Sequence, residues 1–408
     1  MRISSAQYFS MNVSTMSDQQ AQLSNIYQQI SSGNSLTSPA DNPLGAAQAV
    51  QLSSTGTALS QYSTNQSAAL SSLQAEDSTL GSVLSTLQSI NTLGIRAGDG
   101  SLNDADRSAI ATQLTALRDQ LLTYANATDN NGNSLFSGFQ NANQAFTTDS
   151  SGAVVYSGDS GTRTVQVTDS NQMATSDNGA AVFLTVGAVN AEPIASGNSA
   201  NTGTGVIGAV TVNDPTSAAN AHSYQIAFSD TGSGLTYTIT DTTTGVAGSP
   251  QAYTDGANIT MGGQTVAITG TPSDGDSFSV QPAKQAGSDV FANLSEMISA
   301  LQQPVQGNQA AVANLQNALN KGLSQLSNTL ANVTTVQASV GGREQEVKAL
   351  QTVTQTNSLQ NASDLSDLTE TDMVTTISKY TMEQAALQAS QQAFVQIQNM
   401  SLFQYLNN

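Results

Sequence analysis

Apolar residues recur at seven-residue intervals at both ends of the chain. The N-terminal series begins at Phe9, breaks after residue 30, and resumes at residue 52. A second series lies near the C-terminus. Such spacing places apolar side chains in one narrow stripe of a helix, which is the pattern of a coiled coil, and we therefore predict long helices at both ends. The stripes contain Met16, Leu23, Ile30, Leu52, Leu59, Leu73, Leu80, Leu87, Leu319, Leu326, Val333 and Val340.

The last helix is predicted to include Met373 onward, with Asp372 and Thr371 both available to cap it. Its apolar face contains Ile377, Leu387, Phe394 and Leu402. A further helix is predicted over 103–127, where Asn103 and Asp106 have the spacing of a start signal.

Two polar residues, Gln66 and Glu76, occupy stripe positions. Polar residues weaken an apolar stripe, and we expect these two to help define the register of the helices. Few charges flank the stripes, so we expect apolar shape and amide side chains to specify contacts between helices.

The N-terminal pattern is interrupted between residues 33 and 43. Gly33 is suited to the left-handed conformation that ends a helix, and the residue before Pro39 favours extended backbone. Asn42 can cap a second helix whose first residue is Pro43, a position that needs no N–H donor. We predict a joint between a terminal arm and the main coiled coil.

The middle of the chain has a period of two. Segments such as SYQIAFSD (223–230) and LTYTITD (235–241) alternate apolar and polar residues, as half-buried strands do. Gly262 and Gly263 separate two of these segments, which predicts a hairpin with a two-residue turn.

The net charge of −19, from 29 acidic and 10 basic residues, argues against nucleic-acid binding and against docking on an anionic membrane. The chain has no cysteine, which excludes disulfides and thiolate metal sites. The N-terminal residues lack the apolar core of a cleaved secretory leader, and no stretch approaches the roughly 18 apolar residues of a membrane span.

No motif predicts catalysis, a cofactor or a metal. His222 is the only histidine, and we interpret it as an ordinary surface or loop residue. Asp255, Asp274 and Asp276 could be calcium ligands, but an EF-hand loop is missing, so turn residues are the favoured interpretation. Gly341 and Gly342 predict a kink or break in a helix, or alternatively a point where one arm bends.

The predicted fold class is α+β: an elongated multi-helix coiled-coil bundle formed by the N- and C-terminal arms, with an inserted all-β domain. The predicted divisions are an N-terminal arm and joint (1–42), a coiled-coil segment (43–140), an acidic β insert (141–287), a second coiled-coil segment (288–365) and a C-terminal arm (366–408). Pairing of the helices within one chain is expected. Further self-association, or packing against a partner, through the same stripes is the more specific hypothesis.

Several motifs resemble one family. The segment QISSG followed by PADNPLGAAQA (29–49) is similar to the start of flagellin-like proteins of the bacterial flagellum. NNGNSLFSGFQ (130–140), GQTVAITGTPSDGDSFSVQP (263–282) and the C-terminal segment from LSDLTETDM to SLFQYL resemble the hook–filament junction proteins of that family. The resemblance covers both arms and part of the middle.

The resemblance implies a structural protein, without a cofactor, that is exported unfolded without a cleaved signal peptide. Copies would assemble as a ring at the hook–filament junction, outside the cell. It further implies as partners another hook-associated junction protein, flagellin, and an export chaperone at the C-terminal helix. Two alternatives stay open: flagellin itself, and a secreted adhesin-like protein whose β-domain binds a ligand.

Overall fold

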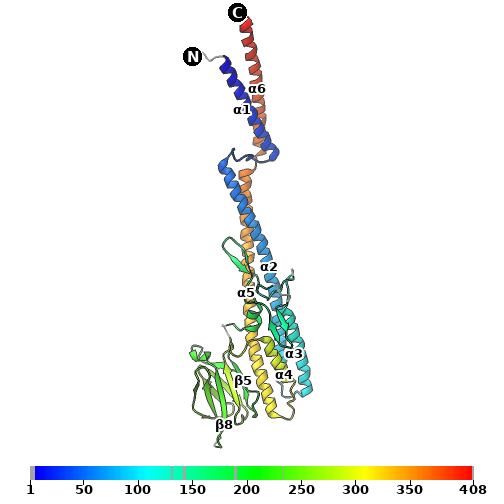
Figure 1. Cartoon of the computed structure of the whole chain (residues 1–408), viewed down its shortest axis with the longest axis vertical. Coiled ribbons are helices and arrows are strands. Elements are labelled where there is room, and N and C mark those ends of the chain that lie inside the picture. Colours follow the sequence, from blue (N-terminus) through cyan, green and yellow to red (C-terminus); the bar gives the residue numbers. More distant parts are fainter. Residues whose placement is uncertain (1–4, 130–131, 141–143, 188–190, 233, 407–408) are drawn as a thin grey trace. The chain divides into compact units, whose positions relative to one another are not determined.

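A computed structural model describes residues 5–129, 132–140, 144–187, 191–232 and 234–406 (Figure 1). The chain divides into two compact units. The terminal unit contains residues 1–64 and 350–408, and the central unit contains residues 65–349.

Long helices form both ends of the chain, as the seven-residue pattern predicted. Two of them, α2 and α5, contribute residues to both units. None of the helices in the described ranges is long and apolar enough to span a bilayer. The helices are α1 (Ser5–Ser32), α2 (Pro43–Ala97), α3 (Asp104–Ala125), α4 (Val290–Leu301), α5 (Gln309–Thr369) and α6 (Met373–Leu406).

In the terminal unit α1 and α6 lie side by side and antiparallel (Figure 1). The ring centroids of Phe9 and Phe394 are 5.1 Å apart, and those of Tyr27 and Tyr380 are 6.4 Å apart. The Asp372 carboxylate accepts hydrogen bonds from the backbone N–H groups of Val374 (3.0 Å) and Thr375 (3.3 Å), which confirms the predicted cap of α6.

In the central unit the predicted start signal of α3 is confirmed. Asn103 Oδ1 accepts from the Asp106 N–H (2.9 Å), and the Asp106 carboxylate accepts from the Asn103 N–H (3.4 Å), a reciprocal capping box. Helix α3 packs on α4, and Arg118 donates a hydrogen bond to the Ser295 hydroxyl (3.1 Å) between them.

The strands of the insert form two separate sets. Short hairpins β1–β2 and β3–β4 come first, and a π-helical turn (Ala180–Leu184) follows them. The remaining strands form a β-domain, which Figure 1 shows beside α5. The strands are β1 (Phe146–Thr148), β2 (Val154–Tyr156), β3 (Thr164–Gln166), β4 (Gln172–Ala174), β5 (Ile194–Gly197), β6 (Val206–Ile207), β7 (Thr211–Val212), β8 (Tyr224–Asp230), β9 (Leu235–Asp241), β10 (Val246–Ala247), β11 (Gln251–Ala252), β12 (Asn258–Met261), β13 (Gln264–Thr269) and β14 (Ser277–Gln281).

The β-domain contains two antiparallel sheets. One has the order β10-β9-β8-β14-β5, with β11 also paired to β9, and the other has the order β12-β13-β6, with β7 also paired to β13. Met261 pairs with Gln264 across Gly262 and Gly263, so the predicted two-residue hairpin is confirmed. Alternate residues of the strands, among them Ile226, Phe228 and Phe278, are buried in one hydrophobic core.

Two short breaks separate the helices of the C-terminal part. Residues 370–372 lie between α5 and α6, where the sequence predicted the start of the last helix. Before α5, α4 ends at Leu301, and Pro304 and Gly307 (φ 82°) lie in the turn. The predicted divisions of the chain stay predictions.

The predicted helix break at Gly341–Gly342 is wrong, because α5 is continuous from Gln309 to Thr369. Glycine weakens a helix by about 1 kcal/mol relative to alanine, a small effect in a helix held by many buried side chains. A Cβ added at either glycine would meet no atom within 4 Å.

Replacing Gly342 by alanine is therefore expected to raise the free energy of unfolding by about 0.5–1 kcal/mol, since alanine restricts the unfolded chain and fits the helix. Chemical unfolding followed by circular dichroism measures this change. The matched control is Gly138→Ala. Gly138 has φ 71°, and an added Cβ would overlap Asp159, so that variant should be destabilised. A destabilised Gly342→Ala variant would contradict the expectation.

Candidate functional site

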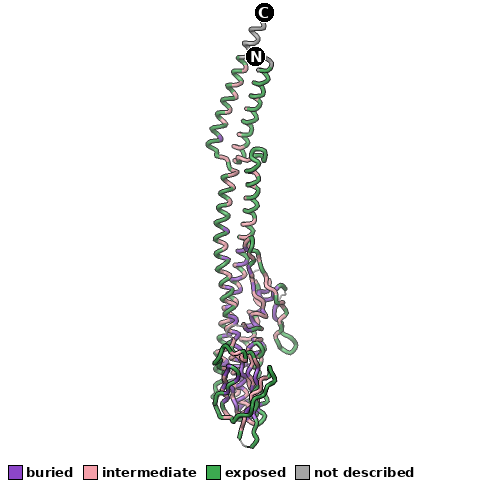
Figure 2. Tube along the Cα trace, turned by 90° about the vertical axis from the view of Figure 1, so that its left-hand side faces the viewer, coloured by how far each residue is buried: buried purple, intermediate pink, exposed green. Residues whose placement is uncertain are grey.

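The apolar stripes are buried to very different degrees in the two units. In the central unit Leu73, Leu80, Leu87, Leu326, Val333 and Val340 are 0% exposed, and Leu319 is 1% exposed. In the terminal unit Met16, Leu23, Ile30, Leu52, Leu59, Leu387 and Phe394 are half-buried. Figure 2 shows the difference as purple segments in the central unit and mainly green and pink helices in the terminal unit.

Two of the predicted stripe residues of α6 do not lie in its half-buried face or among the described side chains. Ile377 is 47% exposed, whereas its neighbour Thr376 is buried. Thr376, Tyr380 and Leu387 share one face of α6, since they are separated by four and seven residues, and Ile377 lies outside this face. The side chain of Leu402 lies outside the described residues.

The terminal unit also exposes large apolar side chains away from the stripes. On α2 and α5 these are Leu44 (70% exposed), Val50, Val353 and Leu359 (69%). On α1 and α6 they include Met11, Val13, Val374 (81%), Met382 and Val395. We call this set the exposed apolar set. Exposed apolar groups are typical of a surface that contacts another protein where they form a contiguous patch.

The interruption between α1 and α2 pairs with the interruption between α5 and α6. Gly33 has φ 72°, and its carbonyl accepts a hydrogen bond from the Thr371 N–H (2.9 Å). The Ser35 N–H donates to the Thr369 carbonyl (2.7 Å). These backbone hydrogen bonds join the loop between α1 and α2 to the break between α5 and α6. The N-terminal sequence alone did not predict this contact.

The start of α2 is built from Asn42 and Pro43. Asn42 Oδ1 accepts from the Gly45 N–H (3.0 Å), and Pro43 is the first helical residue. The loop that precedes it, which contains Pro39, is closed by the Asp41 carboxylate, which accepts from the Ser38 N–H (2.9 Å). The function of this region as a joint stays a prediction.

Amide side chains along α5 bind the backbone of the insert. Asn317 accepts from the Ile207 N–H (2.9 Å) and donates to the Gly205 carbonyl (3.0 Å). Asn328 accepts from the Glu192 N–H and donates to its carbonyl, both at 2.8 Å. Further amide contacts to the insert come from Asn314, Asn320, Gln325 and Asn332.

The two polar stripe residues of α2 also bind the insert. Gln66 donates to the Val167 carbonyl (2.7 Å), and Glu76 accepts from the Asp177 N–H (2.9 Å). These contacts attach the insert to the helices. An amide also joins two helices, since Asn293 of α4 donates to the Gly322 carbonyl of α5 (3.0 Å). The function of Gln66 and Glu76 in defining helix register stays a prediction.

The acidic turn residues make structural hydrogen bonds. Asp276 is buried, and its carboxylate accepts from the N–H groups of Thr202 (2.8 Å), Gly203 (3.0 Å) and Ser273 (2.8 Å). Asp255 accepts from the Gly270 N–H (2.8 Å) and Asp274 from the Asp230 N–H (2.9 Å). Among the described residues, no group of three or more acidic or histidine side chains could hold a metal ion.

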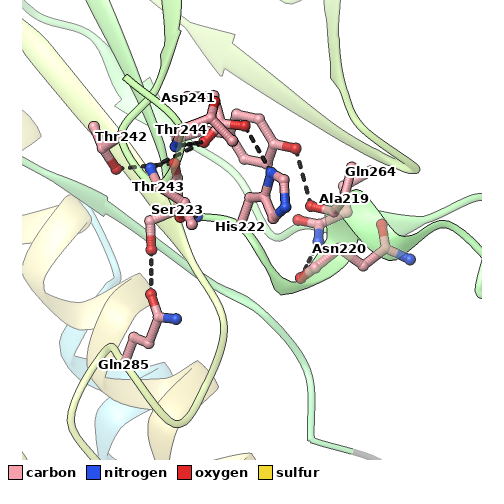
Figure 3. Close-up of polar contacts among 11 residues, drawn as sticks. Ala219, Asn220, His222, Ser223, Asp241, Thr242, Thr243, Thr244, Gln264 and Gln285 are labelled. Carbon is pink, nitrogen blue, oxygen red and sulfur yellow. Dashed lines mark hydrogen bonds and ion pairs between the residues drawn. The ribbon is translucent and has the colours of Figure 1, made fainter. Parts of the chain in front are cut away.

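His222 pairs with Asp241 at the start of β8 (Figure 3). Its Nδ1 is 2.6 Å from Asp241 Oδ2, while Asp241 Oδ1 accepts from the Thr243 and Thr244 N–H groups. Desolvation would raise the pKa of Asp241, but hydrogen bonds from His222 and Thr244 outweigh it and lower that pKa. The hydroxyl of the neighbouring Ser223 donates a hydrogen bond to Gln285 (2.5 Å).

Comparisons with known proteins agree with this architecture. The family described as the bacterial flagellin N-terminal helical region matches residues 3–141. Flagellar hook-associated protein 3 of Salmonella typhimurium is 28% identical over 404 residues, which is 99% of each chain. The crystal structure of hook-associated protein 3 from Legionella pneumophila superposes with a TM-score of 0.70 at 28% identity, covering 78% of this chain and 98% of that chain.

Long terminal helices around an inserted β-domain, together with these matches, make this chain similar to flagellin-like proteins of the bacterial flagellum. The similarity to flagellar hook-associated protein 3 extends along the whole length of the chain. Flagellin of Listeria monocytogenes matches only 26% of this chain, at 30% identity.

Proposed function

We propose that this protein is a structural component of the bacterial flagellum that joins the hook to the filament. The observation that carries the proposal is the full-length similarity to hook-associated protein 3, combined with a terminal unit that leaves large apolar side chains exposed. Those side chains would be covered by other copies of the chain and by neighbouring flagellar proteins in the assembly.

The remaining parts of the proposal follow from this role. The protein leaves the cell without a cleaved signal peptide and functions outside it. Its copies form a ring, with another hook-associated protein on one side and flagellin on the other, and an export chaperone binds the C-terminal helix before export. The role is structural and not catalytic.

Deletion of the gene tests the proposal. Cells that lack the protein are expected to keep their hooks, to lose their filaments and to release unassembled flagellin into the medium. Expression of the intact chain from a plasmid should restore the filaments. Normal filaments in the deletion strain would overturn the proposal.

The two alternative functions predict different results. If the chain were flagellin, the purified protein would polymerise into long filaments on seeding, whereas a junction protein would not. If the β-domain were an essential ligand-binding module, deletion of about residues 150–285 would abolish function. Motility retained after that deletion would exclude the adhesin-like alternative.

A further inference from the structure

The hairpin β3–β4 and the residues that follow it, through Asp177, are attached to two helices by polar side chains. From α2, Asn65 donates to the Gln166 carbonyl (2.8 Å), and Gln66 donates to the Val167 carbonyl (2.7 Å). On the α5 side, the amide of Asn171 donates to the Glu346 carboxylate (3.1 Å). We call residues 164–177 the docked segment.

Glu76 of α2 lies at the end of the docked segment. Its side chain is 0% exposed, and its Oε1 accepts from the Asp177 N–H (2.9 Å). Its Oε2 is also buried and has no hydrogen-bond partner in the described part of the chain. A buried carboxyl oxygen without a partner makes the charged form of this group unfavourable.

Arg343 of α5 completes the arrangement. Its guanidinium forms an ion pair with the Asp177 carboxylate and donates to the Ala174 carbonyl (3.3 Å). The end of the docked segment is therefore held from α2 by Glu76 and from α5 by Arg343. Asp177 lies between them, so ionised Glu76 would place two negative charges together against one positive charge.

Burial is the main reason that the pKa of Glu76 is raised to about 8, and the negative charge of Asp177 is the second reason. The hydrogen bond from the Asp177 N–H and the positive charge of Arg343 offset part of this increase. At neutral pH the buried carboxyl is therefore mostly protonated. Exposed to water, the same group would have an ordinary pKa near 4.5 and would be ionised. The other charged groups on the elements packed here are Asp77, Arg163, Asp169, Glu344, Glu346 and Lys348.

We propose that Glu76 is a proton-controlled latch for the docked segment: the protonated carboxyl keeps residues 164–177 on α2 and α5, and its ionisation favours release. The closed state retains a proton that the open state loses. Closure is therefore most favourable below the ordinary pKa of glutamate and weakens as the pH rises through the pKa of the buried group. The opening equilibrium is expected to increase by up to about tenfold per pH unit between about pH 5 and pH 8, and to level off above that range.

Hydrogen–deuterium exchange of the full-length protein, followed by mass spectrometry, tests the latch. Exchange is measured at about pH 6, 7 and 8 and corrected for the intrinsic rate at each pH; peptides from α3 serve as an internal reference. Protection of residues 164–177 should decrease by roughly fifty-fold between pH 6 and pH 8 in the wild-type protein. Protection that is constant over this range would overturn the proposal.

Two variants separate the latch from general packing. Glu76→Gln keeps the oxygen that accepts from Asp177 and cannot ionise, so its protection should no longer depend on pH. Gln66→Ala is the matched control. It removes a contact of the same segment without a titrating group, so protection should fall by the same factor at each pH. Retention of the wild-type pH dependence by Glu76→Gln would also overturn the proposal.

Asp177→Asn provides an independent measurement if Glu76→Gln folds poorly. This variant removes the negative charge beside Glu76 and leaves Arg343 without its carboxylate partner. Both changes favour ionised Glu76, so the loss of protection should level off at a lower pH than in the wild-type protein. A shift to higher pH would contradict the proposed arrangement.

Discussion

A Leu359→Asp variant is expected to abolish swimming while its free energy of unfolding stays within about 1 kcal/mol of the wild-type value. Leu359 belongs to the exposed apolar set and is 69% exposed on α5. An aspartate at an exposed helical position costs only its weaker helix propensity. In the proposed assembly this position is covered by another subunit, and an aspartate charge buried there without a partner would weaken that contact strongly.

Swimming on soft agar and electron microscopy of the filaments measure the functional effect, and chemical unfolding measures stability. Asn357→Asp is the matched control. It adds the same charge two residues away, at an exposed position that carries no apolar side chain. That strain should swim. Normal swimming by both variants would show that Leu359 makes no essential contact in the assembly.

A Leu87→Ala variant is expected to lose about 3 kcal/mol of the free energy of unfolding, within the range of 2–5 kcal/mol found for buried leucines. Leu87 is 0% exposed in the central unit. Truncation removes its apolar contacts and leaves a cavity that long, straight helices cannot collapse to fill.

Urea unfolding followed by circular dichroism measures this loss. Leu44→Ala makes the same chemical change at a residue that is 70% exposed, and its stability should change by no more than about 0.5 kcal/mol. Equal losses in the two variants would contradict the difference in burial between them.

Features that depend on a few neighbouring residues could be predicted from the sequence. The capping box of Asn103 and Asp106 and the two-residue turn at Gly262–Gly263 are short-range, and each requires residue types with specific hydrogen-bonding groups or backbone freedom. The helices at both ends followed from the seven-residue repeat, because a stripe of apolar residues cannot be buried in any other regular conformation with that spacing.

Features that depend on distant residues were not predictable. Gln66 and Glu76 had the spacing of coiled-coil residues, but their partners, Val167 and Asp177, lie about a hundred residues away. Gly341–Gly342 had the composition of a helix break, yet α5 continues through it. The contacts of Gln66 and Glu76 come from a segment that is distant in the sequence, and the cost of two glycines is small in a long helix.

The sequence by itself therefore determined the helical ends, the alternating strands of the insert and the family resemblance, because periodicity and short motifs are local properties of the chain. Only the tertiary structure decided which apolar stripes are covered and which stay exposed. The same spacing gives 0% exposure at Leu87 and half-burial at Leu52, both on α2. The physical reason is that the burial of a residue depends on how many elements pack around its helix. That number cannot be read from the sequence of the helix alone.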